Sequence, residues 1–306
     1  MKKSLVDILD FEADEINEVF SKTRELKKLS PSNNYAPLKG KTLGMIFRKS
    51  STRTRISFEV GMYQLGGKAL FLNQKDLQWE RGETLSDSAK VMSIYLDGIV
   101  IRTYSHKEVE GLAKAADVPV INGLSDLLHP CQILTDIFTI QEHVDDLKKT
   151  RIVYLGDGNN VANSWINGAA RMGLDLRIVC PENYLPDSNI LKIAQKETAK
   201  SNGKIELCHD PQEGVSGADV IYTDVWVSMG QEEEAIKKKE DFKAFQLNSD
   251  LVKKSGKDPL IMHCLPAHRG EEITSEVMDG PQSIIFNQVE NRLHVQKAIL
   301  EYLLGN

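Results

Sequence analysis

The sequence predicts an α/β fold of two domains, each with a central, mostly parallel sheet flanked by helices. Apolar runs of strand length alternate along the chain with segments in which apolar residues recur at helical spacing. This alternation is the pattern of βαβ units. It occurs in two blocks separated by a charged stretch from residue 142 to 151, and 306 residues are enough for two domains. We therefore expect one domain over residues 1–145 and a second over 146–306.

The first block begins with a helix and contains four strands. Apolar residues at helical spacing cover residues 8–28, and a polar cluster ends that segment. The polar passage at 73–87 is long for a loop in a compact domain, which is typical of a functional loop. A later helix opens near Pro130, a residue suited to the first helical position, and runs towards residue 144. The apolar runs that predict strands are 41–47, 68–72, 97–102 and 118–122.

The second block repeats the alternation of strands and helices. A strand at 152–155 leads into a Gly-containing loop, and a helix then extends to Met172. Further strands are expected at 174–180, 205–208, 220–226, 260–262 and 283–286. A last helix over about 290–304 closes the chain.

The charge and the cysteine content exclude several classes of protein. A net charge of −6 and a pI near 5.7 argue against a nucleic-acid or anionic-membrane partner. No stretch approaches the ~18 apolar residues that a membrane span needs, and the first residues lack the apolar core of a leader peptide. The four cysteines form no C-x-x-C pair, which favours reduced thiols over disulfides or a zinc site. We therefore expect a cytoplasmic protein without a bound metal.

A loop of hydroxyl and guanidinium groups, Ser50 to Arg55, lies between the strand at 41–47 and the helix that follows it. It holds four hydroxyls and two arginines. The first N–H groups of a helix lack intrahelical partners, the helix dipole favours an anion there, and arginine matches a pair of phosphate oxygens. An ordinary helix cap is the alternative. One hydroxyl is enough for a cap, however, and basic residues in a first turn oppose the dipole, so we predict a phosphate or carboxylate site.

Four other candidate side chains stand near the carboxyl ends of predicted strands, where ligands of open α/β sheets collect. They are Arg102, His129, Asp224 and Cys264. Three of them have a structural alternative: a solvated charge for Arg102, a capping or packed histidine for His129 and a buried thiol for Cys264. Position alone leaves these alternatives open.

The loop that begins at Gly156 matches part of the dinucleotide-binding fingerprint. Gly156 and Gly158 occupy two of the three glycine positions, and Glu182 follows the next strand, where it could bind a ribose. Position 161 is valine where the third glycine is required, so the match is weak. A nicotinamide-dependent oxidoreductase is therefore an alternative function from a different class.

Five separated motifs together resemble the aspartate/ornithine carbamoyltransferase family, nearest to its ornithine-specific members. They are Ser51-Thr52-Arg53-Thr54-Arg55, His129-Pro130-Cys131-Gln132, Asp224 with Ser228-Met229-Gly230, His263-Cys264-Leu265-Pro266 and Glu290-Asn291-Arg292. One such match is weak, but five in the family's order cover essentially the whole chain. The resemblance favours the functional alternatives for Arg102, His129 and Cys264.

The resemblance implies a first domain for carbamoyl phosphate, a second for the amino acid, a last helix that packs back on the first domain, and a homotrimer. In this family Arg102 and His129 would polarise the carbonyl oxygen, and Gln132 would hold the amino group. The implied carbamoyl phosphate site comprises Ser51, Thr52, Arg53, Thr54, Gln78, Arg102, His129, Gln132, Cys264, Leu265 and Arg292.

The second substrate implied is L-ornithine, which would become L-citrulline. The matching positions are Asn163, Asp224, Ser228 and Met229, with Cys264 near the δ-amine. That amine has a lysine-like pKa of ~10.4 in water, so a base or a desolvating closure must favour its neutral form, and Cys264 backed by Asp224 could do this. Departing phosphate can accept the proton. The implied catalytic residues are Cys264, Arg102 and His129, and no metal or organic cofactor is required.

Related functions differ from this one in single motifs. An aspartate carbamoyltransferase is expected to carry His-Pro-Leu-Pro-Arg at 263–267, and the Ser228-Met229-Gly230 loop indicates ornithine rather than putrescine or N-acetylornithine. A carbamoyl phosphate binding module without activity is a further alternative. The chain departs from the family's usual residues at Trp79 and Ser88, which concerns the shape of the polar loop and leaves its charged groups intact.

Overall fold

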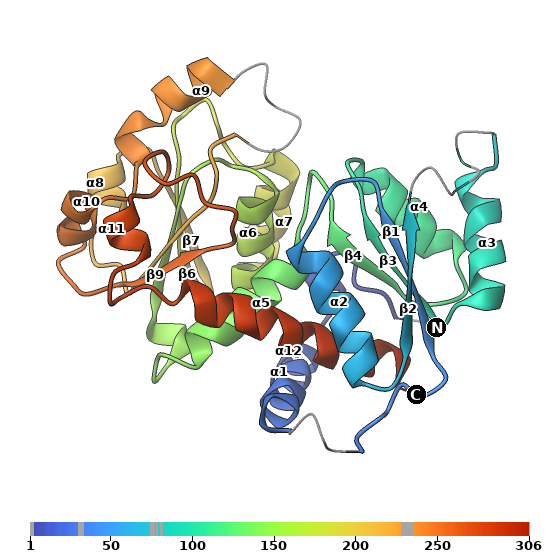
Figure 1. The fold of residues 1–306 in the computed structure, drawn as a ribbon. Helices are drawn as coiled ribbons and strands as arrows, with labels where there is room; N and C mark the ends of the chain where they lie inside the picture. The colour runs from blue at the N-terminus through green and yellow to red at the C-terminus, as the bar shows by residue number, and fades with distance from the viewer. Residues whose placement is uncertain are drawn as a thin grey trace. The chain divides into compact units, whose positions relative to one another are not determined.

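The computed structural model describes residues 3–29, 34–73, 77, 79, 82–227 and 235–305. The chain forms two compact units (Figure 1). Unit 1 comprises Met1–Thr135 and Glu290–Asn306, and unit 2 comprises Asp136–Val289. The change from unit 1 to unit 2 falls inside a helix, and the boundary expected after residue 145 stays a prediction. Each unit is an α/β layer structure with a parallel sheet, as the sequence predicted.

Unit 1 is built on a parallel sheet of four strands in the order β2-β1-β3-β4. The strands are β1 (Thr42–Phe47), β2 (Lys68–Asn73), β3 (Gly98–Arg102) and β4 (Val120–Leu124). The chain leaves β1 towards β2 and then returns to the other side of β1. The carboxyl ends of β1 and β3 therefore flank a topological switch point, which is where open α/β sheets bind ligands.

Helices cover both faces of the unit 1 sheet (Figure 1). Val109 and Leu112 of α4 and Ala89 and Met92 of α3 pack with the strands in one apolar cluster. On the opposite face, α12 contacts Gly61 of α2 and, through its last residue, Leu304, Gly98 of β3. The helical segments are η1 (Ile8–Asp10), α1 (Ala13–Lys28), α2 (Arg53–Gln64), α3 (Leu85–Tyr95), α4 (His106–Ala115), the start of α5 (Pro130–Gln141) and most of α12 (Ile285–Leu304).

The first predicted helix, at 8–28, is interrupted. A short 3-10 turn precedes α1, and Phe11 between them is extended. Each piece has its own capping box, formed by Asp7 with Asp10 and by Glu12 with Glu15. The interruption follows from these caps, because a capping side chain takes up the N–H groups that begin a new helix.

Unit 2 is built on a parallel sheet of five strands in the order β7-β6-β5-β8-β9. The strands are β5 (Arg151–Leu155), β6 (Asp175–Val179), β7 (Lys204–Cys208), β8 (Val220–Thr223) and β9 (Leu260–His263). The switch point lies between β5 and β8. Residues that follow these two strands are thus brought to one edge of the sheet.

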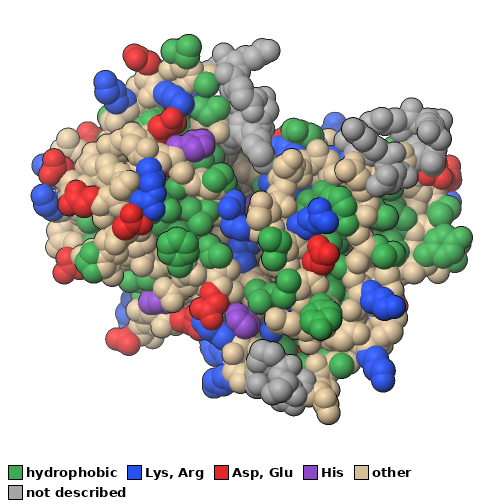
Figure 2. All heavy atoms as spheres, in the orientation of Figure 1, with side chains coloured by type: hydrophobic (Ala, Val, Ile, Leu, Met, Phe, Trp, Pro, Cys, Tyr) green, Lys and Arg blue, Asp and Glu red, His purple; other side chains and the backbone are tan. Residues whose placement is uncertain are grey.

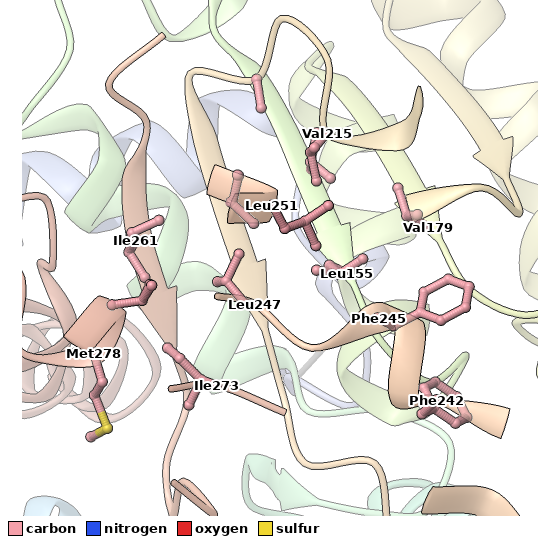
Figure 3. Close-up of a cluster of buried hydrophobic side chains, with 14 of the residues drawn as sticks. Leu155, Val179, Val215, Phe242, Phe245, Leu247, Leu251, Ile261, Ile273 and Met278 are labelled. Atoms are coloured by element: carbon pink, nitrogen blue, oxygen red, sulfur yellow. The ribbon is translucent and has the colours of Figure 1, made fainter. Parts of the chain in front are cut away.

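The unit 2 sheet is also covered on both faces. The helices α6 (Asn160–Met172) and α7 (Ser188–Ser201) lie on one face, and α8 (Pro211–Gly214), α10 (Ser249–Lys254) and α11 (Ser275–Met278) lie on the other (Figure 1). Apolar side chains from the strands and from the second group of helices form the core shown in Figure 3, with Leu155, Val179 and Ile261 from the sheet. The remaining helical segments are η4 (Leu147–Lys149), α9 (Ala235–Asp241) and η6 (Lys243–Phe245).

The strand predicted at 283–286 is wrong. Ser283 forms only an isolated bridge with Ile261, and α12 begins at Ile285. A short apolar run has no periodicity that distinguishes a strand from the first turn of a helix. In the structure Ile284 and Ile285 are buried while Phe286 is 66% exposed, and one helix continues from there to residue 304. The strand predicted at 220–226 is also shorter and ends at Thr223.

The surface carries charges of both signs. Lys, Arg, Asp and Glu side chains are interspersed over the face shown in Figure 2, consistent with the modest net charge. Among the described residues, none of the helices has the length and apolar character required to cross a membrane.

Candidate active site

The turn between β1 and α2 in unit 1 has more hydroxyl groups than capping requires. Arg53 is the first residue of α2, and the side chain of the N-cap residue, Thr52, makes no capping hydrogen bond. The Thr54 backbone N–H instead donates to Ser51 Oγ at 3.2 Å. One hydroxyl of the turn, that of Ser51, thus accepts a backbone hydrogen bond. The predicted anion loop lies at the carboxyl end of β1.

Arg292 on α12 joins two motifs that are far apart in the sequence. Its Nη2 donates to Thr54 Oγ1 at 2.9 Å and its Nη1 to Gln132 Oε1 at 2.5 Å. All three side chains are buried. The last helix therefore connects the loop after β1 with the start of α5 inside unit 1, in agreement with the prediction that it packs back on the first domain.

The imidazole of His129 lies in a strongly positive environment. His129 and Arg102 are 4% and 7% exposed. Burial, and the charges of Arg292, Arg102 and Arg53, hold the pKa of His129 well below its ordinary value. The neutral form of His129 is therefore favoured, and the charges of three guanidiniums act on this one side chain. We call Arg53, Thr54, Arg102, His129, Gln132 and Arg292 the anion site, because three buried or half-buried cations together favour a negatively charged ligand.

Lys49 is a part of this region that reasoning from the sequence missed. It is buried, forms an ion pair with Asp126, and has its Nζ 4.2 Å from the ring centre of Tyr104. The pair connects the residue before the β1–α2 turn with the loop before His129. Its only signal in the sequence was a lysine next to the hydroxyl-rich turn, and that signal does not distinguish a buried lysine from a solvated one.

A second group of polar side chains lies in unit 2, after β5, β8 and β9. Asp224 accepts two side-chain hydrogen bonds, one from Cys264 Sγ at 2.9 Å and one from Asn159 Nδ2 at 2.9 Å. We call Asn159, Asp224 and Cys264 the carboxylate site. Asn159 also caps α6 through the N–H groups of residues 161 and 162. The prediction that Asp224 and Cys264 lie together is therefore confirmed by their hydrogen bond.

The hydrogen bond to Asp224 bears on the role expected for Cys264. Burial raises the pKa of the Cys264 thiol well above its ordinary value, and the Asp224 charge raises it further. The thiol is therefore protonated and donates to the carboxylate. This arrangement opposes the formation of a thiolate, so Cys264 is poorly suited to take a proton from an amine.

The asparagines at the start of α6 differ in accessibility. Asn163 is 4% exposed, and its Oδ1 accepts a hydrogen bond from the Asp187 backbone N–H at 3.0 Å. Asn160, the first residue of α6, is half-buried. Reasoning from the sequence selected Asn163 and missed Asn159, which contacts Asp224, although both lie in the same short segment.

A fully buried pair, His263 and Glu272, supports the segment that carries Cys264. His263 Nε2 lies 3.1 Å from Glu272 Oε1, and the Leu265 backbone N–H donates to His263 Nδ1 at 2.8 Å. Leu265 has a φ of 59°, a conformation that costs a branched residue free energy and that these contacts maintain. Cys264 and Leu265 both belong to unit 2, whereas the other described residues of the predicted carbamoyl phosphate set belong to unit 1.

Three predicted site residues, Gln78, Ser228 and Met229, lie outside the described residues. Two unusual residues of the polar loop can be placed, and they contact each other. The Trp79 indole N–H donates to Ser88 Oγ at 2.7 Å, and Ser88 Oγ donates to Glu83 at 2.5 Å. Trp79 and Ser88, the two positions that depart from the family's usual residues, are thus in direct contact.

The Gly156–Gly158 segment is not shaped as a dinucleotide loop. A Cβ on Gly158 would lie 2.3 Å from the backbone of Leu185 and Pro186. The glycine therefore allows two protein segments to approach, and the space at this position is filled by protein backbone. The Gly158 N–H donates to the Tyr184 carbonyl at 3.0 Å. This contact removes the structural basis of the oxidoreductase alternative.

Asp224, His263 and Cys264 form a cluster of groups that could ligate a metal, and each of them already has a hydrogen-bond partner in the protein. Ligand atoms of Asp224, His263 and Cys264 lie within 4.8 Å of each other, as a cation site would require. The thiol donates to Asp224, however, and both nitrogens of His263 have hydrogen-bond partners. The group is therefore already satisfied by internal hydrogen bonds.

Comparisons with known proteins match both units. A family model for the carbamoyl-P binding domain of aspartate/ornithine carbamoyltransferases matches residues 3–142, and one for the Asp/Orn binding domain matches residues 148–303. The chain is 58% identical over 305 residues to the ornithine carbamoyltransferase of Syntrophus aciditrophicus, covering 99% of this chain and 100% of that protein. It is 51% identical over 306 residues to the anabolic ornithine carbamoyltransferase of Pyrococcus furiosus, covering 99% and 96%. The solved structure of ornithine carbamoyltransferase from Pyrococcus furiosus has a TM-score of 0.95 at 51% identity, covering 100% and 98%.

Proposed function

The chain belongs to the aspartate/ornithine carbamoyltransferase family, and we propose that it transfers the carbamoyl group of carbamoyl phosphate to the δ-amine of L-ornithine, giving L-citrulline and phosphate. One observation carries the proposal: the buried Arg292 joins Thr54 of the β1–α2 turn to Gln132 next to the buried His129, whose pKa is lowered by burial and by the charges of Arg292, Arg102 and Arg53. A dianionic acyl phosphate needs this combination of cations for its phosphate and a neutral hydrogen-bond donor for its carbonyl oxygen. The named activity of relatives at 50–58% identity supports ornithine as the acceptor.

The anion site binds carbamoyl phosphate through its two ends. Ser51, Thr52, Arg53 and Thr54 hold the phosphate with backbone N–H groups, hydroxyls and a guanidinium at the start of α2. Arg102 lies between the phosphate and the carbonyl oxygen. Gln132 holds the carbamoyl amino group through the side-chain oxygen that Arg292 orients. The resemblance to the family also implies Gln78, Cys264 and Leu265 as ligands of carbamoyl phosphate.

His129 donates a hydrogen bond to the carbonyl oxygen as a neutral imidazole. Its pKa is depressed, so no proton has to be removed before the substrate binds at neutral pH. When the amine attacks, negative charge develops on the carbonyl oxygen. Preorganised donors from His129 and Arg102 stabilise that charge, at roughly 3–4 kcal/mol for each donor.

The carboxylate site binds the amino acid. Asp224 and Asn163 hold the α-amino and α-carboxylate groups of ornithine, with Ser228 and Met229 beside them. Cys264 acts as a thiol that orients Asp224 and contacts the δ-amine. The neutral δ-nitrogen forms a bond to the carbonyl carbon, the bond from that carbon to the phosphate oxygen breaks, and the departing phosphate takes the proton from the nitrogen.

The protein functions in arginine metabolism as a cytoplasmic homotrimer. The four cysteines are all free thiols, which supports a reducing compartment. Exposed apolar residues on unit 1, among them Tyr63 of α2 at 81% exposure, support association between copies.

The test is citrulline formation from carbamoyl phosphate, with L-ornithine, L-aspartate, putrescine and N-acetyl-L-ornithine as parallel acceptors. Phosphate release is followed with each acceptor. We expect turnover with ornithine at least a hundredfold above the other three. Turnover with a different acceptor would retain the anion site and overturn the assignment of the carboxylate site. Binding of carbamoyl phosphate without turnover of any acceptor would indicate a binding module.

A further inference from the structure

A buried ion pair next to the carboxylate site has no role in the reaction as described above. Asp157 follows β5, two residues before Asn159, and is 7% exposed. Its Oδ2 accepts a hydrogen bond at 2.7 Å from Nζ of Lys238, which lies on α9 and is 4% exposed. A buried ion pair is costly to form and often gives little stability, so its retention calls for an explanation other than stability.

Lys238 is held in place by aromatic rings as well as by Asp157. Its Nζ lies 5.3 Å from the ring centre of Tyr184 and 5.9 Å from that of Phe242. Tyr184 is itself tied to α9 through a 2.8 Å hydrogen bond to Asp241. Within the described part of unit 2, Lys238 is the only lysine or arginine that is buried. This cation is therefore fixed in position and little screened by water.

The ion pair and the carboxylate site are connected. Tyr154 OH donates to the Asp157 carbonyl at 3.0 Å and lies 3.2 Å from Asn159 Oδ1, while Asn159 Nδ2 donates to Asp224. Asp157 and Asp224 also interact through their charges: burial raises the pKa of Asp157, Lys238 lowers it, and Asp224 raises it. Two buried carboxylates thus stand at one edge of the sheet, and one cation is paired with one of them.

We propose that Lys238 determines acceptor specificity by neutralising Asp157, so that Asp157 adds no further negative charge beside Asp224, the carboxylate that binds the acceptor. This inference rests on the proposed function. The attacking form of ornithine carries one ammonium and one carboxylate. A diamine of the same chain length carries an ammonium and no carboxylate. With Asp157 neutralised, the site accepts the amino acid, whereas an added negative charge at Asp157 would repel the carboxylate of the amino acid and favour the diamine.

The test compares ornithine with putrescine in three variants: Lys238→Met, Lys238→Arg and the double variant Asp157→Asn/Lys238→Met. The measured quantity is the ratio of kcat/KM for the two acceptors at saturating carbamoyl phosphate. If putrescine turns over too slowly, its inhibition constant against ornithine replaces its kcat/KM. Two unit charges that are about 8 to 12 Å apart, at an effective dielectric constant of about 20, interact strongly enough to change the affinity for a charged acceptor by roughly ten- to thirtyfold.

We expect Lys238→Met to lower the ornithine-to-putrescine ratio at least tenfold. Lys238→Arg should keep the ratio within about threefold of the original, because the positive charge remains. The double variant should restore the ratio to within about threefold, because the asparagine side chain that replaces Asp157 carries no charge. Carbamoyl phosphate binding, measured by calorimetry, should be unchanged in all three variants, since the anion site belongs to unit 1.

Two results would overturn the inference. An equal loss with both acceptors in Lys238→Met would assign Lys238 a purely structural role, and a double variant that stays as impaired as Lys238→Met would show that charge is not the cause. The original protein serves as the reference for the proposed function. If the original protein did not carbamoylate ornithine, the proposed function itself would be wrong. That result is obtained before any variant is compared, so it is distinct from a failure of the inference about Lys238.

Discussion

The guanidinium of Arg53 differs from that of Arg55 two residues later, although both are in the first turn of α2. Arg55 is exposed, its Nε bonds to Glu59 at 3.4 Å, and its guanidinium lies 3.8 Å from the ring centre of Phe71. Arg53 is half-buried and acts on His129. The sequence motif contains both arginines, but only one of them contributes to the anion site.

Replacing Arg53 by Ala should weaken carbamoyl phosphate binding by about ten- to a hundredfold. A hydrogen bond between two charged groups contributes roughly 1.5–3 kcal/mol, and this one acts in the ground state and the transition state alike. Isothermal titration calorimetry measures the dissociation constant, with Arg55→Ala as the matched control, for which we expect a change of less than about threefold. Equal effects of the two substitutions would contradict the assignment.

The thiol of Cys264 should remain protonated throughout the pH range in which the enzyme works. Its pKa is raised above the ordinary value by burial and by Asp224, so the neutral form is present below that value and the thiolate forms only at higher pH. The thiolate absorbance difference between the native protein and Cys264→Ser should therefore be flat from about pH 6 to 9. In urea the same difference should rise near pH 8.5, as for an unperturbed thiol.

Cys264→Ser should accordingly keep the shape of the pH dependence of kcat/KM for ornithine. Serine retains a donor to Asp224 and cannot form an anion in this range. Loss of a limb of the profile between pH 7 and 9 in this variant would show that a thiolate takes part, and would restore Cys264 as the base.

At the scale of elements, α12 is the helix that positions Arg292. Leu300 is fully buried on this helix, and a Cβ on Gly61 of α2 would lie 3.6 Å from its side chain. The helices α2 and α12 are therefore in contact here, with the anion loop at the start of α2 and Arg292 two turns before Leu300 on α12.

Leu300→Ala should reduce the free energy of unfolding by about 2–4 kcal/mol, as for other large-to-small changes in a core. It should also weaken carbamoyl phosphate binding, because Arg292 depends on the same helix for its position. Urea denaturation and calorimetry measure the two effects. Asn287→Ala, at an exposed position of α12, should alter neither. Destabilisation with unchanged binding would separate the packing of the helix from the positioning of Arg292.

At the scale of the whole molecule, light scattering should give a mass about three times that of the 34.3 kDa chain. We expect α2 to lie in the contact between copies, where association would cover its exposed apolar side chains, Ile56 and Tyr63. Tyr63→Glu should therefore lower the mass at micromolar concentration. Ile236→Glu, at a residue that is 84% exposed on α9, should leave it unchanged. The reverse result would place the interface on unit 2.

The sequence by itself determined the fold class and the positions of nearly all strands along the chain, and it predicted an anionic ligand at the β1–α2 turn. These features depend on local properties: the period of apolar residues, the chemistry of a helix N-terminus and the presence of motifs in a set order. The run at 283–286 shows the limit of such reasoning, because a short apolar segment has the same local pattern in a strand and in the first turn of a helix.

Only the tertiary structure decided how the charges are distributed. Whether Lys49 and Lys238 are buried, whether the thiol of Cys264 is a donor, and which guanidiniums act on His129 depend on contacts between residues far apart in the chain. Burial and neighbouring charges determine the protonation of a group, and neither property is encoded in the residue type or its immediate neighbours. The residue types of the two sites could thus be predicted from the sequence, while their protonation and their pairing required the fold.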